Sequence, residues 1–237
     1  MIEAIIFDFG GTLDTNGIHW SEQFRMSYEK AKLNINLDDF NEAYVKAEPK
    51  MYETVLENDD LFSTLQKQSY LQLNYLVENK GYKFYNSPGV IASDIADTNC
   101  RYVVKCINEA VKVLDNFKDK IKYSVVSNFY GNIKSVLQSL NIDDYFDSII
   151  DSTIVKIRKP DVRIFSLALD QLNVKAENTL AVGDSYERDI IPAKKLGCKT
   201  AWLNVQSWAQ PENTSAVDFI IKDFKELKNI INKLNID

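Results

Sequence analysis

Short apolar runs of strand length recur along the chain, and they constrain its fold more than any other feature. The runs are apolar on both faces, which is typical of strands buried in a parallel sheet. They lie at Ala4 to Phe7, Tyr123 to Val126, Leu180 to Val182, Lys199 to Leu203 and Phe219 to Ile221. Helical patterns such as Ile133, Val136, Leu137 and Leu140 lie between and after them. This alternation predicts an α/β fold built from βαβ units.

The segment from residue 18 to residue 95 interrupts the alternation. It carries helix-like apolar stripes, among them Phe62, Leu65, Leu73 and Leu76, and no convincing buried strand. We therefore predict two parts: an α/β core made of residues 1–17 and 96–237, and a helical insertion made of residues 18–95.

The charge balance narrows the classes of partner. The chain has 28 basic and 34 acidic residues, a net charge of -6, which gives no electrostatic footprint for nucleic acid or for an anionic membrane surface. Three scattered cysteines suggest neither a disulfide framework nor a zinc site, and no apolar run approaches the roughly 18 residues of a membrane span. We expect a cytoplasmic protein without nucleic-acid or membrane partners; the oligomeric state stays open.

Polar side chains follow three of the predicted strands at the point where each ends. Asp8 follows the first strand, Ser127 the second and Asp184 the third. Functional residues gather at the carboxyl edge of a parallel sheet, so these three are expected to meet at one rim. Each alone reads more simply as a turn former or a helix cap; their convergence is what favours a functional site.

Such a rim suits magnesium and phosphate. Two carboxylates in a poorly solvated site repel unless a cation lies between them, and oxygen-ligated Mg²⁺ fits a site without histidine or cysteine. The Ser127 hydroxyl and the backbone N–H of Asn128 form a natural phosphate donor set. Lys159 precedes Pro160, which we place in the first turn of the helix containing Ile164 to Leu172, and this would fix an ammonium group at a defined loop position.

Taken together, four ordered segments resemble the motifs of the haloacid dehalogenase superfamily, whose members are mostly phosphatases. They are Asp8-Phe9-Gly10-Gly11-Thr12-Leu13, Ser127-Asn128, Lys159-Pro160-Asp161 and Gly183-Asp184-Ser185-Tyr186-Glu187-Arg188-Asp189. The resemblance implies a Rossmann-like parallel sheet core with helices on both faces plus a helical cap domain at the insertion. It also implies a Mg²⁺-dependent phosphatase of a small phosphorylated metabolite.

The resemblance further implies a role for each matching residue. Asp8 would be the nucleophile that becomes an aspartyl phosphate, and Lys159 would stabilise charge on it and on the transferring group. The Asp8 carboxylate, the Gly10 carbonyl and the Asp184 carboxylate would bind Mg²⁺. Thr12, Ser127, Asn128 and Lys159 would hold phosphate oxygens, and Asp189 would bond a metal-bound water or Lys159.

Gly10 departs from the family pattern. The phosphatases read Asp-x-Asp-Gly-Thr, and their second Asp protonates the leaving oxygen and then deprotonates the attacking water; Gly10 can do neither. Such general acid-base catalysis is worth about 10²- to 10⁴-fold, so a slower phosphatase remains possible. An acyl phosphate or anomeric sugar phosphate would need little protonation, and Asp14 and Glu187 are neighbouring acids that could compensate.

Two other functions stay open at this point. One is a metal-free 2-haloacid dehalogenase, in which the same Asp attacks carbon; dehalogenases of the family also lack the second Asp, but generally carry a larger residue where this chain has Gly10. The other is a non-catalytic regulatory protein that binds phosphate esters, which Gly10 favours and the retained carboxylates and lysine oppose.

Overall fold

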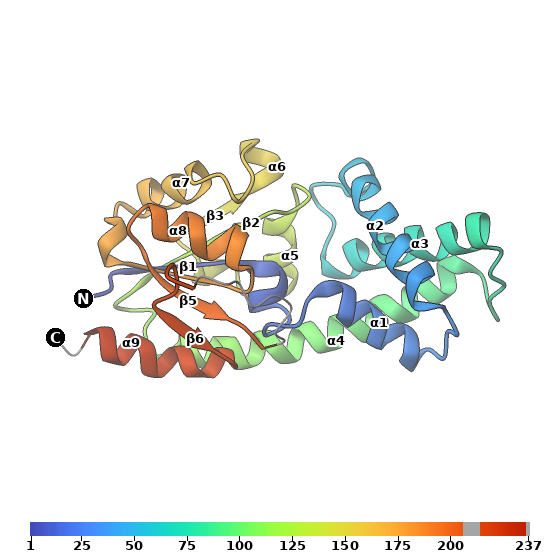
Figure 1. The fold of residues 1–237 in the computed structure, drawn as a ribbon, viewed down its shortest axis with the longest axis horizontal. Helices are drawn as coiled ribbons and strands as arrows, with labels where there is room; N and C mark the ends of the chain where they lie inside the picture. The colour runs from blue at the N-terminus through green and yellow to red at the C-terminus, as the bar shows by residue number, and fades with distance from the viewer. Residues whose placement is uncertain (206–213, 236–237) are drawn as a thin grey trace.

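The structure, a computed structural model, describes residues 1–205 and 214–235. Its core is an open sheet of six parallel strands in the order β3-β2-β1-β4-β5-β6 (Figure 1). The strands are β1 (Ala4–Phe7), β2 (Lys122–Ser127), β3 (Ser148–Asp151), β4 (Thr179–Gly183), β5 (Lys199–Leu203) and β6 (Phe219–Ile221). The five predicted strands are confirmed. Sequence reasoning missed β3, because Ser148-Ile149-Ile150-Asp151 holds only two apolar residues.

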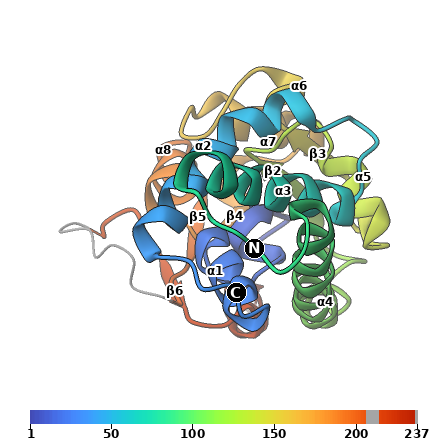
Figure 2. The ribbon, with the colours of Figure 1, turned by 90° about the vertical axis from the view of Figure 1, so that its right-hand side faces the viewer.

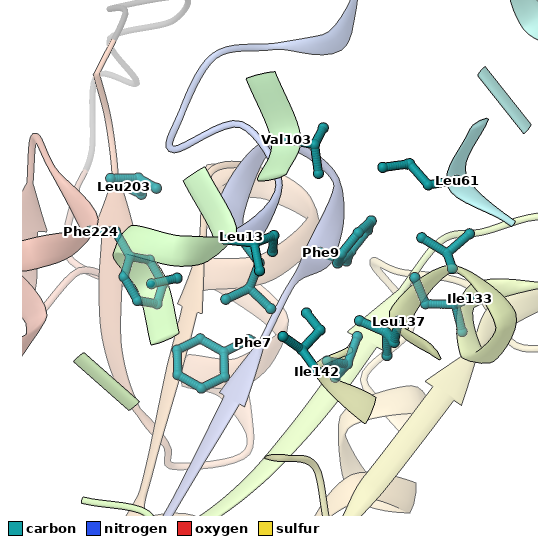
Figure 3. Packing of buried hydrophobic residues seen from close by; sticks show 14 of the residues in the cluster. Phe7, Phe9, Leu13, Leu61, Val103, Ile133, Leu137, Ile142, Leu203 and Phe224 are labelled. Carbon is teal, nitrogen blue, oxygen red and sulfur yellow. The ribbon is translucent and has the colours of Figure 1, made fainter. Parts of the chain in front are cut away.

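Helices cover both faces of this sheet, as predicted. They are α1 (Trp20–Lys30), α2 (Leu37–Thr54), α3 (Leu61–Lys80), α4 (Pro88–Leu114), α5 (Ile133–Ser139), α6 (Ser152–Val155), α7 (Arg163–Leu172), α8 (Ile191–Lys195) and α9 (Leu227–Asn235). Successive residues of β1 serve opposite faces: Ile5 and Phe7 pack with α4, α5 and α9, whereas Ala4 and Ile6 pack with α7 and α8. Figure 3 shows Phe7 and Phe9 among Leu13, Leu137 and Phe224 on the first face.

Helices α1 to α4 form a helical group beside the sheet. α3 packs against both α2 and α4, and in Figure 2 helices α1, α2 and α3 lie in front of the sheet. α4 runs unbroken out of this group and along the sheet, where Val103, Ile107 and Leu114 join the core (Figure 1). The predicted division at residues 95 and 96 falls inside α4, so the boundary stays a prediction. Within the described ranges, no helix is long and apolar enough to cross a membrane.

Candidate active site

The candidate site lies where three neighbouring strands end. β1 is flanked by β2 and β4, and Phe7 is in register with Val125 and Val182. The chain leaves these strands at the same edge of the sheet, which brings Asp8, Ser127 and Asp184 to one cavity. The expected convergence of these three residues is therefore present in the structure.

Lys159 joins two carboxylates at the base of the cavity. Its Nζ donates to Asp8 Oδ1 at 2.5 Å and to Asp189 Oδ1 at 2.6 Å, and all three side chains are buried. Burial disfavours the ammonium, but the charges of Asp189 and Asp8 outweigh it and raise the pKa of Lys159. Lys159 therefore stays charged next to Asp8.

Asn128 fixes the backbone that carries Lys159. The Asn128 Nδ2 donates to the Lys159 carbonyl at 3.0 Å, and the Lys159 N–H donates to Asn128 Oδ1 at 2.9 Å. This side chain therefore holds the Lys159 backbone, and the Asn128 backbone N–H remains the donor expected to bind phosphate. The Ser127 side chain, also buried, lines the cavity.

The expected place of Pro160 in the first turn of a helix is wrong. α7 begins only at Arg163, three residues later, and the Lys159–Pro160 peptide is cis. A turn separates Pro160 from the helix. It is closed by Asp161, whose Oδ1 accepts from the Arg163 N–H at 3.0 Å. Lys159 is thus positioned by Asn128 and by its two ion pairs.

Asp184 completes a cluster of carboxylates. One oxygen each of Asp8, Asp184 and Asp189 lie within 4.8 Å of one another. Burial, and then the charge of Asp8, raise the pKa of Asp184 well above its usual range. Both oxygens of Asp189 are engaged, by Lys159 and by the Ser185 N–H at 3.0 Å. The second Asp8 oxygen and the Asp184 carboxylate meet only the long contacts of Thr12, at 3.4 Å, so this pair has oxygens to offer to a cation.

This donor set fits Mg²⁺. The ion takes oxygen ligands and is commonly bound by one or two carboxylates, and the pair Asp8 and Asp184 supplies them without a competing histidine or thiolate. Thr12 lies beneath the pair, where its Oγ1 is 3.4 Å from both Asp8 Oδ2 and Asp184 Oδ1. Thr12 is fully buried and is not part of the cavity wall. Its expected contact with phosphate stays a prediction.

The two glycines after Phe9 differ in what they require. Gly11 has φ +95°, and a Cβ there would lie 2.5 Å from an Asp184 carboxylate oxygen. Gly10 has φ -72° and ψ 112°, values open to any residue, and a Cβ there would meet only the Trp20 indole, at 3.8 Å. Gly11 is therefore required by the backbone and by Asp184, whereas nothing steric requires glycine at position 10.

We expect Gly11→Ala to lower the free energy of unfolding by about 1–3 kcal/mol, the usual cost of a strained backbone conformation. Gly10→Ala is the matched control: it should leave stability unchanged or raise it by about 0.4–1 kcal/mol, because alanine restricts the unfolded chain without strain. Urea unfolding of both variants measures the difference. Equal stability of the two variants would contradict this assignment of the glycines.

The upper wall of the cavity comes from the helical group. His19 and Trp20 of the α1 start, Tyr44 and Glu48 of α2 and Gln68 of α3 line it. They face Phe129 and Tyr130, which follow β2, and the Tyr130 hydroxyl donates to the Glu48 carboxylate at 3.0 Å. Sequence reasoning assigned none of residues 18–95 to substrate. A usable signal was present, because the two amides Gln68 and Gln72 lie among the leucines on the buried face of α3.

The two neighbouring acids considered as substitutes for the missing Asp are placed differently. Glu187 is exposed and lies outside the cavity wall. Asp14 lines the cavity and is fully buried, and burial raises its pKa to about 7. Its Oδ1 accepts from the Gly11 N–H at 2.7 Å and its Oδ2 from Trp20 Nε1 at 2.8 Å. Asp14 thereby holds the Trp20 indole beside Gly10.

Fold and site together define an α/β protein with a carboxylate and lysine cluster at the end of its central strand. Residues 2–197 match the family model of the haloacid dehalogenase-like hydrolases. The chain therefore belongs to this family of hydrolases, and the resemblance seen in its motifs is confirmed.

Several curated proteins are similar to the chain. Glyceraldehyde 3-phosphate phosphatase of Pyrococcus abyssi is 30% identical over 209 residues, which are 86% of this chain and 82% of the relative. Pyrimidine 5'-nucleotidase YjjG of Escherichia coli is 32% identical over 126 residues, 52% of this chain and 56% of the relative. The match covers 56% of YjjG and 41% of glyceraldehyde 3-phosphate phosphatase from Pyrococcus furiosus, so it spans about half of each relative's length.

Solved structures agree in fold over the whole chain. L-2-haloacid dehalogenase from Xanthobacter autotrophicus superposes with a TM-score of 0.62 at 18% identity and full coverage of both chains. The putative hydrolase YfnB from Bacillus subtilis gives 0.58 at 19% identity, covering 98% of this chain and 99% of that one. At such identities the likeness concerns the fold alone.

Proposed function

We propose that this protein is a magnesium-dependent phosphatase of a small phosphorylated metabolite that acts through an aspartyl phosphate. The excess of buried negative charge carries the proposal: Asp8, Asp184 and Asp189 converge within 4.8 Å, and Lys159 is their one ion-pair partner in the described residues. A divalent cation would offset this excess. The phosphatase names of several relatives point the same way.

The proposed reaction uses the residues as they lie. Asp8 attacks phosphorus, the bond from phosphorus to the leaving oxygen breaks, and water then hydrolyses the aspartyl phosphate to restore Asp8. Lys159 stabilises the developing charge, while Asp189 positions Lys159. Asp8, Asp184 and the Gly10 carbonyl would hold magnesium, which would supply charge stabilisation for the phosphoryl oxygens.

Proton transfer to the leaving oxygen is where this site differs from the family pattern. Gly10 contributes no acid, and Asp14 has both oxygens engaged by N–H donors. We therefore propose that solvent supplies the proton and that phosphates with stable leaving groups, such as acyl or anomeric sugar phosphates, react fastest. The relatives named for glyceraldehyde 3-phosphate do not identify the substrate of this protein, because a name describes only the protein that carries it.

The other two functions are less well supported by the site. A metal-free dehalogenase would have to keep the Asp8 and Asp184 carboxylates together without a second cation, and Gly10 offers no group to receive halide. A protein that only binds phosphate esters has no evident need for the ion pair of 2.5 Å between Lys159 and Asp8.

Metal removal tests the proposal. We expect purified protein to release inorganic phosphate from acyl or anomeric sugar phosphates, and a chelator to reduce the rate about 100-fold or more, since metal stabilisation is worth several kcal/mol. Added Mg²⁺ should restore the rate. Chelator-resistant halide release from a 2-haloacid would instead identify a dehalogenase, and tight binding of phosphate esters without product would identify a binding protein.

A further inference from the structure

Gln68 is a polar residue of the cavity wall that the proposed reaction does not use. It lies on α3 with the apolar residues Leu61 and Leu65, and its side chain lines the cavity although only 5% of the residue is exposed. Gln72, one turn further along the same helix, is fully buried and its Oε1 accepts from the Tyr28 hydroxyl at 2.9 Å. Only Gln68 of this pair is directed to the cavity.

The amide of Gln68 has no hydrogen-bond partner among residues 1–205 and 214–235, whereas Thr64 and Glu48 in the same wall are paired. Thr64 Oγ1 donates to the Asp60 carbonyl at 2.8 Å and accepts from Asn132 at 2.7 Å. Both oxygens of Glu48 accept from Tyr130 at 3.0 Å. Because buried amides are normally paired, a group that enters the cavity is the natural partner of Gln68.

The size and charge of the cavity limit that group. Its volume is about 140 Å³, below the range of roughly 300–1,000 Å³ that takes drug-sized ligands. A nucleoside monophosphate, with base and ribose, belongs to the larger class. Above the carboxylate and lysine cluster the wall holds Asp14, Glu48 and Arg188, so it carries acidic and basic groups and does not by itself select a leaving group of one charge. A neutral amide can donate to a carbonyl and both donate to and accept from a hydroxyl.

We propose that Gln68 is a specificity-determining residue: it hydrogen-bonds a hydroxyl or carbonyl group on the leaving part of a small phosphate ester, no larger than a simple sugar phosphate. This inference rests on the proposed function, because the phosphate must lie at Asp8. Through Gln68, the helical group would select the leaving part of the substrate by its polarity as well as by its size.

A pair of ligands that differ only in hydroxyl groups tests Gln68. Glycerol 1-phosphate and propyl phosphate would be measured as competitive inhibitors of p-nitrophenyl phosphate hydrolysis in the presence of Mg²⁺. We expect Gln68→Leu to weaken inhibition by glycerol 1-phosphate about 10- to 100-fold, the loss of one buried hydrogen bond. Inhibition by propyl phosphate should stay the same or improve.

Two further variants keep the test decisive. Gln66→Leu makes the same change on the same helix away from the cavity, where Gln66 Nε2 donates to Ser93 at 2.6 Å, and should alter neither inhibitor. Gln68→Met keeps the length of the side chain but removes the amide, so it should also weaken glycerol 1-phosphate and spare propyl phosphate if the leucine variant does not fold. An equal loss for both inhibitors, or none, would overturn the role of Gln68.

Failure of the two proposals can be told apart. If the wild type hydrolyses p-nitrophenyl phosphate but Gln68→Leu does not discriminate between the inhibitors, the phosphatase stands and the role of Gln68 falls. If the wild type does not hydrolyse it, calorimetric dissociation constants of the same two ligands decide the Gln68 comparison, and only the phosphatase falls. Strong inhibition by uridine monophosphate at the level of glycerol 1-phosphate would contradict the size limit.

Discussion

Asp8→Asn is expected to reduce phosphate release by roughly 10⁴-fold or more, because the variant has no nucleophilic carboxylate. The substitution keeps the size of the side chain but also removes the charge that pairs with Lys159 Nζ at 2.5 Å. Steady-state assays with an acyl phosphate would measure the loss. Acid-quenched wild type should carry a phosphoryl group on Asp8, detectable by peptide mass spectrometry, and the variant should carry none.

Asp161→Asn is the matched control for Asp8. Asp161 lies in the same motif as Lys159, but it bonds Arg163 ahead of α7 and lies outside the cavity wall. Asparagine keeps an oxygen that can accept from the Arg163 N–H, so turnover should change less than about twofold, as for surface substitutions in general. Undiminished turnover in Asp8→Asn would refute the assignment of the nucleophile.

The strands and their carboxyl edge were predictable because buried parallel strands leave a direct pattern in the sequence. Ile5 and Phe7 serve one face of the sheet and Ala4 and Ile6 the other, so all four positions must be apolar. A polar residue that ends such a run is conspicuous, as Asp8 is. β3 lacked this signal, because its ends are Ser148 and Asp151 and one of its two isoleucines is only partly buried.

The position of Lys159 was less accessible to sequence reasoning. Its neighbour Pro160 suggested the start of a helix, but the turn closed by Asp161 delays α7 to Arg163. What holds Lys159 is Asn128, 31 residues earlier in the chain. A hydrogen bond between two loops depends on how the strands are ordered in the sheet. Such a bond cannot be predicted from a local pattern of residues.

The residues of the helical group were the least predictable part of the site. Gln68 faces the cavity because α3 packs on α2 and α4 while α4 is anchored under the sheet. The sequence shows that amides lie among the leucines of one α3 face, but not whether this face meets a core or a cavity. That distinction separates Gln68 from Gln72, which lie on the same face of one helix.

Gly10→Asp is the second large effect that we expect. For alkyl phosphates, whose leaving oxygen needs a proton, the variant should raise the catalytic rate by about 10²- to 10⁴-fold, the usual contribution of a general acid and base. The backbone at position 10 has φ -72°, and a Cβ there meets only Trp20, at 3.8 Å, so neither the backbone nor the Cβ of an aspartate is strained. Initial rates of phosphate release from glycerol 1-phosphate would measure the gain.

Gly10→Asn distinguishes proton transfer from a mere change in the loop. It fills the same space beside Trp20 but cannot exchange a proton, so it should leave the rate with glycerol 1-phosphate near that of the wild type. With an acyl phosphate, whose leaving group departs as a stable anion, both variants should differ little from the wild type. A rate gain shared by the two variants would show that the mobility of the glycine, and not the missing acid, limits the enzyme. Restoration of activity by aspartate in an otherwise inert protein would show that Gly10 had converted a catalytic site into a binding site.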